Sequence, residues 1–424
     1  MKRSLLFLLT ITIIFSTALT ASAALDAEAI GMGDNFSTMT GEAAYYSNPA
    51  GMALRENNFA LKANFGFSVW NNVFENSEFT EDEIESKLTG EDLILAGRSA
   101  FGTQFYYKNF ALAVNGRAEG MLETDSDAAE ILTGDTPEIS LDALRDKGLI
   151  RVKFEESGGG AAATADVSLS YAREIFNNWS NNSKNIDSVY FGATYHYLEG
   201  EIYKFAGNGE INAEAIIDNS NPNNSYVKYD GSAEFFANRT EDGEASGNAF
   251  DFGLSMKTED DYTFAFSAMN IGELSADQYY KDGAKYEAKD SDSDGNNDYL
   301  EETTYKGALQ NKKITYKLPR VYRLGIKKEF SQNTVLYADY SRVSYDGGQD
   351  DNIYAIGSEF RKTKFIPLRL GLNYSSLRED VELAAGMGIN ISDNFKINVG
   401  ISDLMALSDS AKGLKFGIST FIGF

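Results

Sequence analysis

The chain has 424 residues, with 63 acidic and 38 basic side chains, a net charge of −25 and 13% aromatic residues. This acidity argues against nucleic-acid binding, which depends on Lys and Arg. The absence of cysteine excludes disulfides and thiolate metal sites, and a single histidine leaves little material for acid–base catalysis. We therefore expect a folded protein that is not an enzyme.

Residues 1–23 have the pattern of a secretory signal peptide. Lys2 and Arg3 precede an apolar stretch from Leu5 to Leu19, and Ala21-Ser22-Ala23 forms a small-x-small cleavage site. The alternative, a membrane-anchor helix, needs about 20 apolar residues, and this stretch is shorter. The sequence therefore predicts export and cleavage after residue 23.

Residues 24–57 form a compact segment rich in small side chains. Ala29-Ile30-Gly31-Met32-Gly33 is followed by Thr40-Gly41-Glu42-Ala43-Ala44-Tyr45-Tyr46-Ser47-Asn48-Pro49-Ala50-Gly51-Met52-Ala53. It is not a phosphate-binding loop, because no strand precedes it and no GxGxxG or Lys-Ser/Thr completes it. An Asn-Pro turn and small residues that permit close approach are typical of a segment folded into a confined space.

From residue 58 to the end of the chain, apolar and polar residues alternate in short runs. A period of two is typical of a strand with one apolar and one polar face. The runs cover residues 58–69, 100–107, 110–122, 164–173, 188–203, 247–257, 262–271, 319–330, 334–345, 352–361, 365–376, 381–391, 395–402 and 414–424. Fourteen is an even number, as bacterial single-chain barrels require, so we predict an all-β, 14-stranded antiparallel transmembrane β-barrel.

The connections between these runs differ in length according to their order. Every second connection is short, whereas four of the others are long: residues 72–98, 123–163, 204–245 and 273–317. These four hold 36 acidic and 16 basic residues, and hence −20 of the net charge. Short turns on one side and long outer loops on the other are typical of membrane barrels. The same order places Phe424 at the short-turn side.

The fourth long connection contains a motif for calcium. Residues 290–301 satisfy D-x-D-x-D-G-x5-E in full. The candidate ligands are Asp290, Asp292, Asp294, Asn296 through its carbonyl, Asp298 through water, and Glu301. Such hard oxygen ligands suit Ca²⁺. The alternative is a solvated acidic loop.

The segment from Gly31 to Ala53, with its Gly-rich start and Asn-Pro-Ala-Gly motif, resembles the mature N-terminus of the FadL family of outer-membrane transporters for hydrophobic compounds. PorV-like and TraF-like barrels have a similar opening. The resemblance implies a bacterial outer-membrane location, contact with membrane lipid and a plug inside the lumen. The residues that inherit the plug role are Gly31, Gly33, Glu42, Asn48, Pro49, Ala50 and Gly51. The aromatic final residue, Phe424, resembles the signal that the barrel assembly machinery reads.

Two functions follow from this resemblance. The first is passage of hydrophobic small molecules across the outer membrane, with a route sideways through a kink in the third strand, where Asn115-Gly116 and Gly120 lie. The second is a structural or secretion-associated barrel that acts through protein partners. The acidic loops depart from the apolar outer loops of the family and argue against a fatty acid as the cargo.

Overall fold

The computed structural model describes residues 26–55, 57–72, 92–125, 149–177, 186–217, 220, 225–241, 243–290, 297–363, 365–392, 394–404 and 412–424. The signal peptide expected at residues 1–23 lies outside this range and stays a prediction. Among the described helices, none is long and apolar enough to cross a membrane.

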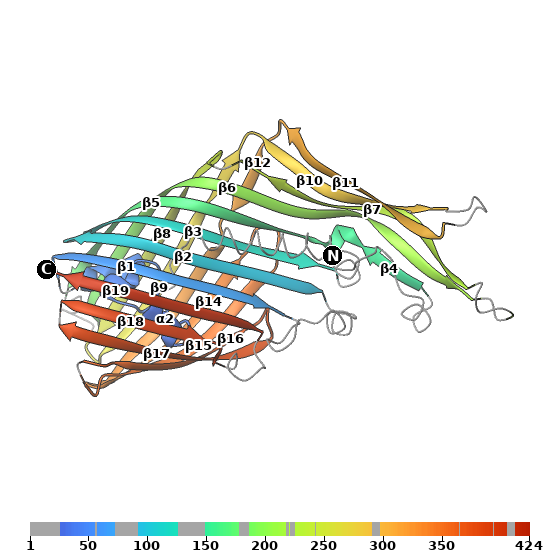
Figure 1. The fold of residues 1–424 in the computed structure, drawn as a ribbon. Coiled ribbons are helices and arrows are strands. Elements are labelled where there is room, and N and C mark those ends of the chain that lie inside the picture. The colour runs from blue at the N-terminus through green and yellow to red at the C-terminus, as the bar shows by residue number, and fades with distance from the viewer. Residues whose placement is uncertain are drawn as a thin grey trace.

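Fourteen antiparallel strands close into a barrel, which confirms the predicted fold class (Figure 1). They pair in chain order, and β1 closes the ring by pairing with β19 from Ala60↔Gly423 to Trp70↔Gly413. The strands are β1 (Phe59–Asn71), β2 (Leu93–Tyr107), β3 (Phe110–Thr124), β5 (Gly158–Asn177), β6 (Ile186–Ile216), β8 (Ala245–Thr258), β9 (Tyr262–Ala276), β13 (Arg320–Ser331), β14 (Thr334–Ser344), β15 (Asp350–Phe360), β16 (Leu368–Ser375), β17 (Asp380–Ser392), β18 (Phe395–Ser402) and β19 (Gly413–Gly423). Each predicted run corresponds to one of these strands.

Five further strands lie at the end of the barrel where the long connections are: β4 (Leu149–Lys153), β7 (Tyr226–Arg239), β10 (Tyr279–Lys289), β11 (Tyr299–Gln310) and β12 (Ile314–Lys317). β4, the far half of β6, β7, β10 and β11 pair in that order into a sheet that projects beyond the barrel (Figure 1). We call it the outer sheet. The predicted loops at 204–245 and 273–317 are therefore mostly strands.

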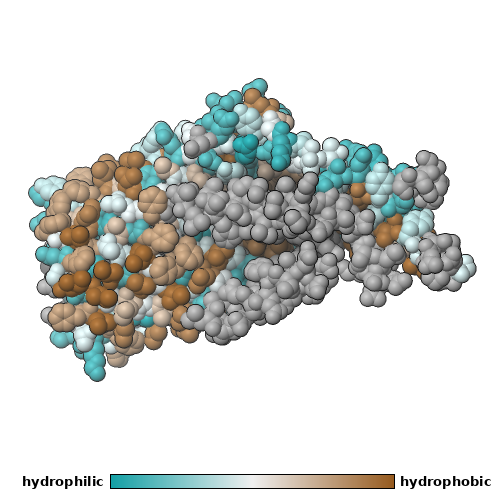
Figure 2. Space-filling model, in the orientation of Figure 1, coloured by the Kyte–Doolittle hydropathy of each residue, from teal (hydrophilic) through white to brown (hydrophobic). Residues whose placement is uncertain are grey.

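The barrel wall has an apolar outer surface and a polar inner one. Large apolar side chains are exposed around the outside and give the brown band of Figure 2. Examples are Phe101, Phe105, Leu112, Val114, Leu169, Phe250, Phe252, Leu324, Leu336, Ile356, Leu370 and Ile389. Polar side chains at alternate positions are buried in the lumen, among them Asn64, Gln104, Asn115, Ser168, Asp251, Arg323, Asp339 and Arg369. This is the pattern of a barrel that spans a membrane.

The wall is continuous where a sideways opening was expected. β3 pairs with β2 and with β5 along its whole length without a shift in register, so Gly116 and Gly120 do not kink it. The irregularity lies instead in β9, where the pairing with β8 shifts register beside Asn270, which has φ 58° and donates its N–H to Asp251 at 2.6 Å. Beyond this bulge β9 leaves β13 and pairs with β12.

Candidate functional site: the plugged lumen

The N-terminal segment fills the lumen at the end with the short turns (Figure 1). It contains α2 (Ala27–Gly31) and the 3-10 turns η1 (Gly41–Ala44) and η2 (Pro49–Leu54). Asp26 caps α2 by accepting the N–H of Glu28 at 2.9 Å. Asn48 caps η2 by accepting the N–H of Ala50 at 3.1 Å, and Pro49 takes the first position, where a missing N–H costs nothing. We call residues 26–55 the plug.

The plug lies against wall glycines, which let two backbones approach closely. A Cβ on Gly31 would stand 2.7 Å from Cα of Gly386 in β17, and one on Gly33, at φ 72°, would stand 2.7 Å from the backbone nitrogen of Leu372 in β16. On the other side of the lumen, a Cβ on Gly192 in β6 would stand 2.3 Å from the carbonyl carbon of Pro49. Side chains at these positions would displace the plug.

Charged groups of the wall hold the plug as well. Asp339 of β14 accepts hydrogen bonds from the backbone N–H groups of Phe36 and Ser37, each at 2.6 Å, and from the Ser37 hydroxyl at 2.8 Å. Lys415 of β19 pairs with Asp34 of the plug, and both are buried. Because a buried charge without a partner is costly, these contacts fix the position of the plug strongly.

The same kind of contact recurs near the two ends of the plug. Lys62 of β1 pairs with Asp26, and Arg369 of β16 lies 3.3 Å from the Glu28 carboxylate. Glu42 lies 3.8 Å from Arg55 within the plug, and Gly51 is so close to Met39 that a Cβ would stand 2.2 Å from its carbonyl oxygen. All seven plug residues named from the sequence therefore lie inside the lumen, against the wall or against the plug itself.

At the opposite end, the connection between β14 and β15 crosses the mouth of the barrel. Asp346 lies 2.9 Å from Nζ of Lys204 in β6 and accepts the N–H of Lys317 at 3.2 Å. Gln349 donates to Glu123 of β3 at 2.7 Å. These partners lie on strands that are not neighbours of β14 or β15, so residues 345–349 partly cover the lumen.

Two clusters of buried apolar side chains lie in this half of the barrel. The first joins β5, β6, β8, β9 and β12, and the second is centred on Trp70 of β1. The first contains Ala162, Leu198, Ile202, Ala245, Ala249, Leu274, Ala276, Ile314, Tyr316 and Leu318; the second contains Trp70, Ile94, Ala96, Met121 and Leu377, with Tyr345 against it. The half of the lumen that faces the long connections thus contains two apolar clusters beside buried charged side chains such as Arg117, Glu119 and Asp351.

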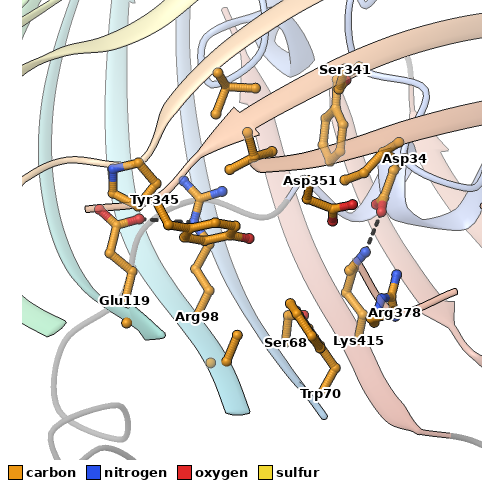
Figure 3. A pocket seen from close by; sticks show the side chains of 18 of the residues that line it. Asp34, Ser68, Trp70, Arg98, Glu119, Ser341, Tyr345, Asp351, Arg378 and Lys415 are labelled. Atoms are coloured by element: carbon orange, nitrogen blue, oxygen red, sulfur yellow. Dashed lines mark hydrogen bonds and ion pairs between the residues drawn. The ribbon is translucent and has the colours of Figure 1, made fainter. Parts of the chain in front are cut away.

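A cavity of about 100 Å³ lies between the plug and the second cluster. Trp70 and Tyr345 line it together with charged side chains from the plug, from five strands and from the turn between β16 and β17. Figure 3 shows Arg98 beside Glu119, 3.5 Å apart, on one side, and the pair of Asp34 and Lys415 on the other. The cavity therefore has both aromatic and ionic walls.

The single histidine, His196 of β6, is buried in the lumen wall between two carboxylates. Its Nδ1 lies 2.9 Å from Asp166, and its Nε2 lies 2.8 Å from Asp251. Because an ionised carboxylate only accepts hydrogen bonds, this arrangement suits a doubly protonated ring. Asp251 also accepts the N–H of Asn270, so the group stabilises the bulge in β9. His196 thus forms part of the wall.

The predicted calcium ligands that the structure describes lie at the ends of β10 and β11, in the outer sheet. Asp292, Asp294 and Asn296 fall outside the described residues. Asp290 follows β10, Asp298 precedes β11, and Glu301 lies within β11, 3.7 Å from Lys289. No group of three or more acidic or histidine side chains that suits a metal ion occurs in the described part of the chain. Calcium binding stays a prediction.

Comparison with known proteins finds solved barrels with a similar fold. No protein-family model and no curated protein matches the sequence. The structure resembles the toluene transporter TbuX of Ralstonia pickettii (14% identity, 96% of this chain and 100% of that chain, TM-score 0.52) and the toluene transporter TodX of P. putida (12%, 95% and 99%, 0.52). A FadL homologue of Pseudomonas aeruginosa matches at 12% identity over 95% and 100% of the chains, with a TM-score of 0.50.

At these identities the likeness concerns the fold, and it confirms the resemblance to FadL-type barrels that the N-terminal motif indicated. The fold and the apolar outer band are those of a bacterial outer-membrane protein, as predicted. The sequence reasoning missed the wall partners of the plug, such as Asp339 and Lys415. No signal in the sequence could have singled them out, because charged side chains are common on the inner face of this barrel.

Proposed function

We propose that this protein is an outer-membrane channel for small hydrophobic molecules. The observation that carries the proposal is the combination of a plug at one end of the barrel with two clusters of buried apolar side chains in the other half of the lumen. The buried cluster around Ile314, Tyr316 and Leu318 and the cluster around Trp70 offer an apolar path towards the plug. An open pore for ions and sugars would have neither feature.

Because the plug fills one end of the lumen, a solute can cross the barrel only when the plug moves. Its contacts combine close backbone packing with buried ion pairs, so a diffusing solute meets a closed barrier rather than water. A cargo that gains free energy by leaving water for these apolar clusters reaches a higher local concentration beside the plug. The likeness to toluene transporters supports an apolar cargo but does not identify it.

Uptake by proteoliposomes tests the proposal. Vesicles that contain the protein are expected to take up a radiolabelled neutral single-ring hydrocarbon or a short alkane faster than empty vesicles, while glycerol enters both at the same rate. The glycerol control separates a selective route from a leak around the barrel. Equal rates for every apolar solute with and without protein would show that the protein is not such a channel.

The second function considered, a barrel that acts through a protein partner, is favoured by one observation. β11 pairs with β10 alone, so in the described structure it forms an edge of the outer sheet, and most of its side chains are exposed. An unpaired edge strand can add a strand from another chain. Cross-linking from Thr303→Cys in β11 to a specific envelope protein in cells would support this function, and cross-links to lipid alone would argue against it.

A further inference from the structure

Among the described residues, the cavity above the plug contains one cationic side chain that forms no direct ion pair, although the carboxylates of Asp34, Asp251 and Asp339 lie farther off. Three of its four cationic side chains lie near a carboxylate: Lys415 pairs with Asp34, Arg378 pairs with Glu382, and Arg98 lies 3.5 Å from Glu119. Arg323 of β13 is the fourth. Within the described part of the chain no carboxylate oxygen lies within 4.0 Å of it, although it is only 7% exposed.

The contacts of Arg323 leave part of its guanidinium free. Its Nη1 donates to the carbonyl oxygen of Ser47 at 3.3 Å, and its guanidinium lies over the ring of Phe36, 4.9 Å from the centroid. Its Nε has no acceptor among the residues that the structure describes. A buried guanidinium with an unused donor is costly unless something completes its hydrogen bonds. Since Arg323 lines the cavity, the missing acceptor has room to bind there.

A carboxylate is the acceptor that fits this side chain best. Its two oxygens match the planar fork of a guanidinium, and a charge-assisted pair is roughly twice as strong as a neutral hydrogen bond. The other walls of the cavity include the aromatic rings of Phe36, Trp70 and Tyr345, which suit an apolar or ring-shaped body. The site therefore offers an ionic partner and an apolar surface together.

The volume of the cavity limits the size of the ligand. An engineered cavity of about 150 Å³ is known to hold benzene. At about 100 Å³, this cavity admits a short-chain acid, or a single ring with slight movement of the side chains around it. We propose that the cavity binds small amphipathic carboxylates, up to one ring in size, through Arg323. The proposal rests on the proposed channel function and defines its cargo more closely.

The charge of the mouth and the charge of the cavity are opposite in sign. The four long connections hold −20 of the net charge, whereas the side chains that line the cavity include four cations against Asp34, Glu119 and Asp351. Repulsion by exposed charges is screened within about 10 Å at 0.1 M salt, while buried groups are screened much less. Added salt is therefore expected to speed the association of a carboxylate with the intact protein.

Intrinsic fluorescence measures the binding directly. The chain has two tryptophans, so in a Trp179→Phe background Trp70 is the only one and lies in the wall of the cavity. Titration of this protein in lipid nanodiscs with benzoate and with benzamide, which have nearly the same shape, isolates the effect of charge. We expect benzoate to bind roughly 10–100-fold more tightly. Equal affinities would overturn the proposal.

Variants of Arg323 identify the residue responsible. R323Q is expected to abolish the preference for benzoate, and R323K to keep part of it. R320Q, which removes an exposed arginine from the same strand, is the matched control and should retain the full preference. A preference that survives R323Q would refute the role of Arg323. If R323Q does not fold, the wild-type comparison of benzoate with benzamide still decides.

The two proposals fail in different ways. If neutral hydrocarbons are taken up but benzoate binds no better than benzamide, the carboxylate site is wrong and the channel stands. If benzoate is preferred but no apolar solute is taken up, the channel function is wrong, and Arg323 remains a binding group in a protein of another function.

Discussion

Replacement of Asp339 by alanine tests how the plug is held. The Asp339 carboxylate accepts three hydrogen bonds from Phe36 and Ser37, at 2.6, 2.6 and 2.8 Å, and is buried. Hydrogen bonds to a charged group contribute about 1.5–3 kcal/mol each. Water entering the space left by the side chain recovers part of this, so we expect the D339A substitution to weaken plug docking by about 3–6 kcal/mol.

The assay uses the absence of cysteine in the chain. Ala44 of the plug is fully buried, so in an Ala44→Cys protein a maleimide reacts only when the plug detaches from the barrel wall. A loss of 3–6 kcal/mol raises the open population, and hence the labelling rate, by roughly 10²–10⁴-fold. D350A is the control, because it removes an exposed carboxylate of the neighbouring strand that pairs with Arg342 at the surface. A change of less than about threefold in D339A would refute the anchoring role.

Three other predictions concern the packing of the plug against the wall and the outer sheet. G371A would place a Cβ 2.1 Å from the carbonyl carbon of Met32, so we expect about 1–3 kcal/mol of destabilisation and a lower Tm, whereas G97A, whose nearest neighbour would be at 3.9 Å, should leave the Tm unchanged. Hydrogen bonds from Lys285 and Lys289 lower the pKa of Glu287 from 4.5 to about 2, so its contribution to the β10–β11 hairpin is complete above pH 4.5 and is lost as the pH falls to about 2. Amide exchange in that hairpin, corrected for intrinsic rates, should therefore accelerate in this range in the wild type but not in Glu287→Gln. Calorimetry at millimolar Ca²⁺ should show heat that Asp292→Ala with Glu301→Ala removes, and unchanged heat would exclude the calcium site.

The barrel could be predicted from sequence because its signal is local. A period of two survives in each of the fourteen runs, since one face of every strand meets lipid and the other meets the lumen. The strands of the outer sheet gave no such signal. β7 and β10 carry polar or charged residues on both faces and lie outside the membrane, so their alternation is weak and they were interpreted as loops.

The contacts of the site could not be predicted in the same way. Asp339 meets Phe36 across 303 positions of sequence, and neither residue stands in a motif that points to the other. The plug motif predicted which segment enters the lumen, because small residues and an Asn-Pro turn are local features. It did not predict which strands receive the segment, because that depends on how the barrel closes. Arg323 was missed for the same reason, since only the closed barrel shows that no carboxylate of the described residues lies within 4.0 Å of it.

The central claim is that the barrel is closed by its plug and is not a diffusion pore. Conductance of the intact protein in a planar lipid bilayer tests this claim most directly. We expect no steady ion current for the wild type and transient opening steps for D339A, in which the plug is released more often. A large steady current through the wild type, of the kind that an open porin carries, would contradict it.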